Sequence, residues 1–227
     1  MSIKAGRAAA PLSCDGEIHQ NRADHPLHKR RGSKPVPATA ATYSVSDLVR
    51  DLRAIVATTT DNREIVRQVM PLARRIAAQP DICRKEFYAC DEAQGMGINI
   101  LHEEPDHSLL VEAIAWMPGR GVMPHDHQTW GVVVGLDGNE TNVNWRRKDD
   151  GSRPGYAELE VHHEVAVKHG DVVAFLPDDI HSVRNDGDET TLSLHIYGRS
   201  LAHLDRSEFD PDANIQRPCP KRVRRHV

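Results

Sequence analysis

The sequence predicts an all-β domain, either a sandwich or a barrel, with α-helices at its N-terminal side. From about residue 96 onward, short apolar runs alternate with turns that are rich in Gly, Pro and Asp. Runs of strand length separated by such turns are typical of sandwiches and barrels. The stretch before them carries apolar residues at helical spacing instead. A chain of 227 residues is long enough to bury the core of one such domain.

Two helices are expected ahead of the strands. In the first, apolar side chains recur at helical spacing after Ser46, a suitable N-cap. The second begins with a capping-box pattern at Asp61. Pro71 lies within this second helix and predicts a kink or a break there, because proline lacks the N–H that the helix would use. Both helices are expected to pack against a sheet.

Four segments are expected along the chain. Residues 1–42 are rich in Ala, Pro, Ser and basic residues without periodicity, which predicts a disordered or loosely ordered tail. A helical segment at 43–94 leads into the barrel, with its candidate site, at 95–204. Residues 205–227 are polar and basic, which predicts a second tail.

The overall charge gives no sign of a nucleic-acid or membrane partner. The formal net charge is -4 at pH 7. No apolar run approaches the roughly 20 residues that are needed to cross a bilayer. The N-terminal stretch is basic but lacks the apolar core of a signal peptide. We therefore expect a cytoplasmic protein, a monomer or small homo-oligomer, with no nucleic-acid or membrane partner.

A pair of histidines in the segment MPHDHQTWG is the first sign of chemistry. His125 and His127 are two residues apart, and on an extended strand such residues point to the same side. Two imidazoles on one side can share a metal ion. The chain has 14 histidines, so one such pair is expected by chance and the motif alone is weak.

Two longer patterns strengthen this interpretation. The first comprises Gly119, His125, His127 and Gly138, and the second comprises Gly170, Pro177, His181 and Asn185. Their order and spacing resemble the two motifs of the cupin superfamily over about residues 95–200. The resemblance implies a double-stranded β-helix (jelly-roll) barrel with the N-terminal helices packed against it. The usual cupin glutamate is absent, since Gly131 and Val132 stand at its position.

By this resemblance, the metal ligands would be His125, His127 and His181. Most non-haem iron oxygenases use two histidines and a carboxylate. Three neutral imidazoles leave the charge of a divalent metal uncompensated, which favours an anionic substrate such as a thiolate. Zinc or nickel stay open as alternatives on the ligands alone. The other alternative is a degenerate cupin in which the histidines only form hydrogen bonds.

A second pattern lies on a late strand, in the segment LSLHIYG. Ser193, His195 and Tyr197 follow one another at every second position, so on a strand they share one face. A tyrosine hydroxyl oriented by a histidine, which a serine orients in turn, is typical of the groups that support a metal site. The alternative is that these side chains only fill the barrel interior with satisfied hydrogen bonds.

Three-histidine ligation, the missing glutamate and Ser-x-His-x-Tyr together resemble the cysteine dioxygenase family of thiol dioxygenases, and HDHQTWG is most similar to its bacterial branch. The resemblance implies an Fe(II) cofactor and a small thiol, of the cysteine or 3-mercaptopropionate type, that O2 oxidises to its sulfinate. It also implies catalytic roles for Tyr197, His195 and Ser193. Gly131 would stand where animal members carry a cysteine that cross-links to the tyrosine, so no such cross-link is expected with Tyr197.

The residues that bind the substrate follow less directly. The family usually anchors the substrate carboxylate with Arg or Gln on an early strand, but the matching position near 97–99 has neither. We expect Asn99 to donate a weaker hydrogen bond, Arg199 to face the same cavity as Tyr197, and Trp130 to line that cavity. The alternative for Arg199 is an exposed surface position.

Two other functions stay open. The first is a different cupin dioxygenase, acting on a ring or a diketone with another metal, and the Ser-x-His-x-Tyr pattern argues against it. The second is a non-catalytic cupin that binds a metal or ligand as a sensor. The complete set of three histidines argues against loss of catalysis.

Overall fold

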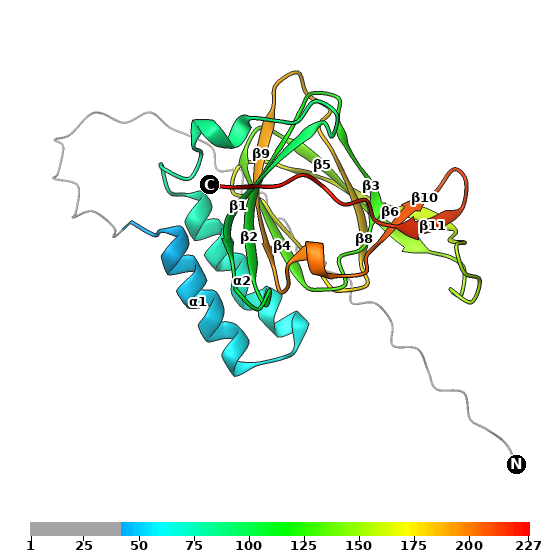
Figure 1. Cartoon of the computed structure of the whole chain (residues 1–227), viewed down its shortest axis with the longest axis horizontal. Helices are drawn as coiled ribbons and strands as arrows, with labels where there is room; N and C mark the ends of the chain where they lie inside the picture. The colour runs from blue at the N-terminus through cyan, green and yellow to red at the C-terminus, as the bar shows by residue number, and fades with distance from the viewer. Residues whose placement is uncertain (1–41) are drawn as a thin grey trace, which may run out of the picture. The chain divides into compact units, whose positions relative to one another are not determined.

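Two six-stranded β-sheets form the barrel in the computed structural model of the chain, which describes residues 42–227 (Figure 1). The first sheet has the order β12 (Arg225–His226), β1 (Met96–Glu103), β2 (Leu110–Trp116), β9 (Thr191–Tyr197), β4 (Gly131–Asp137) and β7 (Val172–Phe175). The second has the order β11 (Ile215–Pro218), β10 (Ser207–Asp210), β3 (Gly121–His125), β8 (Ile180–Arg184), β5 (Glu140–Arg147) and β6 (Leu159–Val167). Neighbouring strands are antiparallel except β1 and β12. The predicted cupin double-stranded β-helix is confirmed. The tail expected at 1–42 lies outside the described residues apart from its last one.

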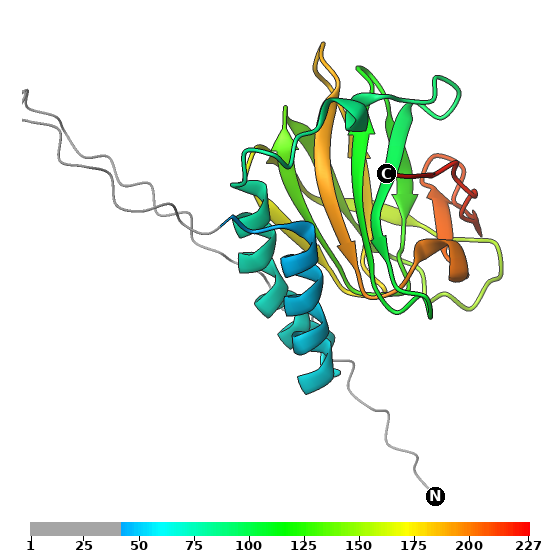
Figure 2. The same cartoon turned by 60° about the vertical axis from the view of Figure 1, so that its left-hand side comes forward.

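Two α-helices cover the outer face of the first sheet, as Figure 2 shows. They are α1 (Val45–Thr58) and α2 (Asn62–Ala77), and the 3-10 helix η1 (Lys85–Tyr88) follows them. Their apolar stripes join the sheet in one core, whose helix members include Leu48, Leu52, Ile65, Val69, Ala73 and Ile76. Pro71 lies inside α2 without dividing it. The predicted packing of two helices against a sheet is therefore confirmed.

The caps of the two helices differ in detail from the sequence prediction. Ser44, not Ser46, is the N-cap of α1, because Ser44 and Asp47 form a reciprocal capping box. Asp61 caps α2 as expected, and its side chain accepts hydrogen bonds from the first turn. The reciprocal half of a capping box is absent there, because the N–H of Asp61 donates to the hydroxyl of Thr59.

Several strands of the first sheet are buried on both faces, and this determines where the site lies. β2, β4 and β9 are buried along nearly their whole length. On β9, Leu192, Leu194 and Ile196 pack into the core beneath the helices. The residues between them point to the opposite side, which is the barrel interior.

Residues 205–227, expected as a polar tail, are instead folded against the barrel. The 3-10 helix η2 (Leu201–His203) leads into β10 and β11, and the chain then crosses the barrel to β12 (Figure 1). Charged side chains that suggested a tail form ion pairs here: Arg217 with Glu208 at 2.8 Å, and Arg224 with Glu112 at 3.7 Å. β12 pairs with β1. Polar composition predicted an unattached tail, but ion pairs of Glu208, Arg217, Arg222 and Arg224 and the strand hydrogen bonds attach the segment to the barrel.

No helix within residues 42–227 is both long and apolar enough to cross a membrane. The cytoplasmic location, the oligomeric state and the domain boundaries stay predictions.

Candidate metal centre

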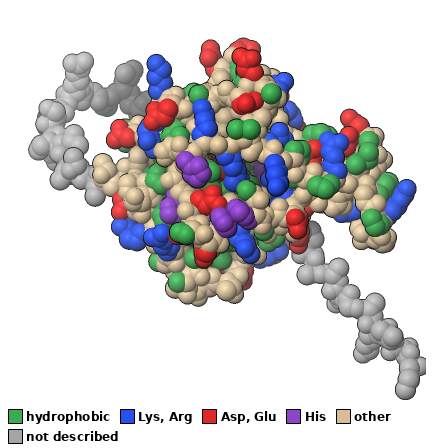
Figure 3. Space-filling view, viewed as in Figure 1, with side chains coloured by type: hydrophobic (Ala, Val, Ile, Leu, Met, Phe, Trp, Pro, Cys, Tyr) green, Lys and Arg blue, Asp and Glu red, His purple; other side chains and the backbone are tan. Residues whose placement is uncertain are grey.

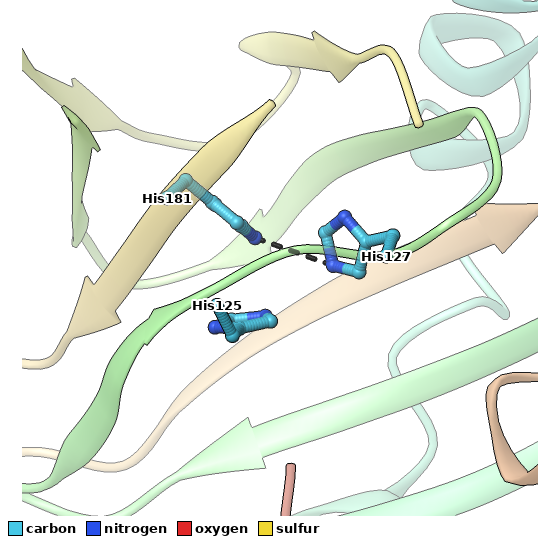
Figure 4. A group of neighbouring side chains, drawn as sticks. All are labelled: His125, His127 and His181. Atoms are coloured by element: carbon cyan, nitrogen blue, oxygen red, sulfur yellow. Dashed lines mark hydrogen bonds between the residues drawn. The ribbon is translucent and has the colours of Figure 1, made fainter. Parts of the chain in front are cut away.

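Three histidines meet inside the barrel. His125 ends β3, His127 follows it in the connection to β4, and His181 lies on β8. β3 and β8 pair in a register that sets His125 opposite His181. Nitrogen atoms of the three rings lie within 4.8 Å of one another, and Figure 4 shows the rings gathered around a common space. The structure therefore brings the predicted trio together, and their role as metal ligands stays a prediction.

Burial keeps all three imidazoles neutral. Burial lowers the pKa of His125 to about 4. Burial also holds the pKa values of His127 and His181 well below the ordinary range, and the neighbouring histidines lower them further. A neutral imidazole is the form that offers a lone pair to a metal. The three rings are thus ready to bind a cation at neutral pH.

Hydrogen bonds orient two of these rings. Nδ1 of His125 donates to the carbonyl oxygen of Met123 at 2.9 Å, and Nδ1 of His181 donates to Oδ1 of Asn142 at 3.2 Å. With Nδ1 protonated, Nε2 of each ring presents its lone pair. Asn142 lies on β5 and is fully buried. Sequence reasoning missed it, because β5 is mostly polar and nothing along the strand sets this asparagine apart.

The remaining nitrogens test whether a metal fits. Nε2 of His127 and Nε2 of His181 are 3.4 Å apart and buried, while Nδ1 of His127 has no hydrogen-bond partner in the described part of the chain. Without a cation, either Nε2–H of His127 donates to Nε2 of His181 and Nδ1 of His127 is left as a buried acceptor without a partner, or two buried lone pairs face each other. A divalent cation bound to the Nε2 atoms would remove the conflict, so the three histidines fit a metal.

The predicted chain of Ser193, His195 and Tyr197 is present on the inner face of β9. The Ser193 hydroxyl lies 2.9 Å from Nε2 of His195, and Nδ1 of His195 lies 2.8 Å from the Tyr197 hydroxyl. The ring centroids of Tyr197 and His127 are 5.1 Å apart, so the chain reaches the histidine centre. We call these three residues the relay. Their catalytic roles stay a prediction.

The relay is uncharged. Burial lowers the pKa of His195 to about 3. Burial also raises the pKa of Tyr197 above its ordinary value, and the carboxylate of Glu112 raises it further. At neutral pH His195 therefore carries one ring proton and Tyr197 keeps its hydroxyl proton. In each hydrogen bond of the relay, either partner can be the donor. Which one donates depends on the groups at the two ends of the relay.

A cavity of about 350 Å³ lies beside the histidines and the relay. One wall is apolar and comprises Met96, Ile98, Ile114, Trp116, Val122 and Val183. The C-terminal segment closes another side with Arg206, Lys221, Arg222 and Arg224. In the space-filling view, Lys and Arg side chains gather beside a hollow near the middle of this face (Figure 3). The acidic residues Glu112, Asp205 and Glu208 line the cavity as well, so a small anionic molecule matches only the part of the wall at Arg206 and Lys221.

None of the three residues expected to bind the substrate lines this cavity. Trp130 packs into the core beneath the helices. Asn99 is buried on the outer face of β1, where its amide donates to the carbonyl oxygens of Phe87 and Ala113 at 3.0 Å and 3.2 Å. Arg199 follows the end of β9 and is exposed. Trp130 and Asn99 thus lie away from the cavity, contrary to expectation, and Arg199 takes the alternative, exposed position.

Sequence reasoning missed the arginines that do line the cavity, because they belong to the segment read as a tail. Arg224 pairs with the buried Glu112 at 3.7 Å, and Arg222 lies 3.8 Å from Glu208. Within residues 42–227, no carboxylate lies within ion-pair distance of Arg206. Lys221, which also lines the cavity, has no ion pair within the described residues either, so a bound anion can pair with Arg206 or Lys221, and of these only Arg206 offers a guanidinium.

Comparisons with known proteins gave one matching family model and several solved structures of low similarity. The family model described as cysteine dioxygenase type I matches residues 33–209. A double-stranded β-helix protein of Klebsiella pneumoniae is 14% identical, over 53% of this chain and 91% of that one, with a TM-score of 0.38. A cupin-like protein of Thermotoga maritima is 15% identical, over 50% and 75%, with a TM-score of 0.36. The cupin domain of an XRE family transcriptional regulator of Enterobacter cloacae is 18% identical, over 47% and 99%, with a TM-score of 0.34.

Proposed function

Because the chain belongs to the cysteine dioxygenase type I family, we propose that it is a non-haem Fe(II) enzyme that oxidises a small thiol to its sulfinate with both atoms of O2. The thiol is of the cysteine or 3-mercaptopropionate type. One observation carries the proposal: the three neutral histidines meet the relay beside a single cavity, which His125, His181, His195 and Tyr197 line together with Arg206. A sensor that only binds a metal would not need a relay that ends at the metal site.

His125, His127 and His181 would hold the iron. When bound, Fe(II) would supply open positions for the thiolate and for dioxygen, and would pass electrons from the sulfur, which is oxidised, to dioxygen, which is reduced. The three donors are neutral, so they favour a substrate that arrives as an anion. The choice of iron over zinc or nickel rests on the family, since the three imidazoles alone would suit each of these metals.

The protein's own groups bind and orient the substrate. Arg206 would bind the substrate carboxylate, because a guanidinium donates two parallel hydrogen bonds to a carboxylate. Tyr197 keeps a neutral hydroxyl next to the histidines, where it can hydrogen-bond a reactant. The apolar wall, with Ile98 and Ile114, displaces water from the reactants. Holding both ends of the substrate makes the reaction effectively unimolecular, which lowers the entropic part of the activation barrier.

Oxygen uptake by protein loaded anaerobically with Fe(II) tests the proposal. The thiols are cysteine, 3-mercaptopropionate and cysteamine, and mass spectrometry detects the sulfinate. We expect equimolar oxygen consumption and sulfinate formation with a thiol that carries a carboxylate. His181→Ala should lose both iron and activity, while the exposed His162→Ala should keep both. Absence of sulfinate with every thiol, in protein shown to contain iron, would overturn the proposal.

A further inference from the structure

Glu140 is a buried carboxyl group that the proposed mechanism does not use. It lies at the start of β5 and is 2% exposed. The hydroxyl of Thr191 donates to Oε1 at 3.1 Å, and Oε2 has no hydrogen-bond partner in the described chain. Glu140 and Asn142 occupy alternate positions of β5, so they face the same side, where Asn142 orients His181. The carboxyl therefore lies in the barrel interior, behind the relay.

Glu140 is close to the far end of the relay. Burial raises the pKa of Glu140 to about 7, and the nearby hydroxyls of Ser193 and then Thr191 act in the opposite direction. A hydroxyl lowers the pKa of a carboxyl by donating to its ionised form. Ser193 therefore lies between Nε2 of His195, to which it is hydrogen-bonded at 2.9 Å, and the Glu140 carboxyl, whose Oε2 has no partner in the described chain and is free to accept a hydrogen bond.

We propose that Glu140 is a positioning residue at the end of the relay, and that the proton on its carboxyl decides the direction of the hydrogen bonds through Ser193, His195 and Tyr197. The consequence for catalysis rests on the proposed function, but the effect on His195 does not. Glu140 acts through other residues and touches no reactant.

In the ionised state, the relay points away from the cavity. The Glu140 carboxylate accepts a hydrogen bond from the Ser193 hydroxyl. The oxygen of Ser193 then accepts from Nε2–H of His195, which leaves Nδ1 of His195 unprotonated. Nδ1 accepts from the Tyr197 hydroxyl, so the tyrosine oxygen presents only lone pairs to the cavity. A reactant in the cavity meets an acceptor.

In the protonated state, every hydrogen bond reverses. The carboxylic acid donates to the oxygen of Ser193, and the Ser193 hydroxyl donates to Nε2 of His195. His195 now carries its proton on Nδ1 and donates to the tyrosine oxygen. The Tyr197 hydroxyl is free to donate into the cavity. Only Glu140 gains a proton; the other three groups keep the same number of protons and stay neutral.

Among the groups joined by these hydrogen bonds, Glu140 is the one that titrates, because none of its neighbours in the described chain forms an ion pair with it. Its partner across β6 is the apolar Val167. On β8, Arg184 lies beside Thr141, but its guanidinium binds the exposed Asp186 and Glu164. From β9, the uncharged side chains of Thr191 and Ser193 face it, and behind them lies neutral His195. At the end of β4, Asp137 accepts a hydrogen bond from the hydroxyl of Tyr88. No ion pair to Glu140 forms within residues 42–227.

The ring tautomer of His195 tests the proposal directly. Zinc-loaded protein with 15N-labelled histidine is measured by NMR between about pH 5 and 9, and a His195→Gln variant assigns the signals. We expect the ring proton of His195 to move from Nδ1 to Nε2 as the pH rises through about 7. In Glu140→Gln the tautomer should not change with pH. A wild-type tautomer that is constant over this range, or a Glu140→Gln protein that switches like wild type, would overturn the proposal.

Two further variants test the proposal even if Glu140→Gln fails to fold. Thr191→Val keeps the glutamate but removes a donor that lowers its pKa, so the tautomer switch should shift to higher pH. Ser193→Ala separates the carboxyl from His195, so the switch should vanish although Glu140 still titrates. A Thr191→Val protein whose switch moves to lower pH would contradict the proposal.

Activity separates this proposal from the proposed function. With a thiol that is oxidised, the pH profile of kcat should show an ionisation near neutral pH that Glu140→Gln removes, with iron content unchanged. If no thiol is oxidised but the tautomer switch depends on Glu140, the proposed function fails and this inference stands. If thiol oxidation occurs and Glu140→Gln leaves both the pH profile and the tautomer of His195 unchanged, this inference fails and the proposed function stands.

Discussion

Replacing Glu140 by glutamine should stabilise the protein at neutral pH and change its stability little at acidic pH. In the unfolded chain the carboxyl ionises near its ordinary pKa of 4.5, whereas burial in the folded barrel raises that pKa to about 7. The folded state therefore holds a proton that the unfolded state releases between these values. Stability that is fully present below about pH 4.5 is lost as the pH rises through 7. Glutamine has no proton to release.

The structure sets the size of this effect. A pKa change from 4.5 to about 7 corresponds to about 3 kcal/mol, at roughly 1.4 kcal/mol for each tenfold change in proton affinity. The assay is urea unfolding of both metal-free proteins at several pH values between about 4.5 and 8. The difference in unfolding free energy between Glu140→Gln and wild type should rise by about 3 kcal/mol across this range.

A matched control isolates the role of burial. Glu164 lies on the adjacent strand β6 but is exposed, so Glu164→Gln should change stability by less than about 1 kcal/mol at every pH. If the difference between Glu140→Gln and wild type is the same at pH 5 and pH 8, the carboxyl does not titrate differently in the folded state. That result would refute the reasoning.

Three other predictions concern the cavity and its histidines. Arg206→Ala should raise KM for a thiol carboxylate by roughly 10- to 100-fold, because a charge-assisted hydrogen bond is lost, while KM for cysteamine, which has no carboxylate, should not change. Equal effects on both thiols would contradict this role. His181→Ala should abolish stoichiometric metal binding, measured by elemental analysis, whereas His162→Ala should retain it. Gly131→Ala should destabilise the protein by about 1–3 kcal/mol in urea unfolding, since its Cβ would lie 3.0 Å from two ring carbons of Tyr197; full wild-type stability would contradict this close approach of the ring to the backbone.

The sequence by itself determined the local geometry of the site. Side chains alternate across a strand, so Ser193, His195 and Tyr197 had to share one face, and their hydrogen bonds confirm it. The motif that contains His181 identified the third histidine across 54 residues, because its spacing resembles a known barrel. Helical spacing likewise predicted two helices on the sheet. Each of these inferences needs only a repeat along the chain or a known pattern.

Only the tertiary structure determined which face of each strand lines the cavity. β4 and β9 are buried on both faces, since the helices cover the outer one, so no alternation of polar and apolar residues marks the inside. Asn99 lies on β1, whose first five residues are all buried, and Trp130 directly precedes β4, so the sequence did not show that both side chains lie away from the cavity. A residue's position along a strand predicts which neighbours share its face, but not what packs against that face.

The tertiary structure also decided which distant polar residues meet. Asn142 and Glu140 lie near His181 and Ser193 because β5 pairs with β8 in one register and faces β9 across the barrel. Arg206 reaches the cavity because the C-terminal segment is folded over it. Polar residues of this kind carry no periodic signal, since their burial is stabilised by partners far away in the sequence rather than by neighbours along the chain.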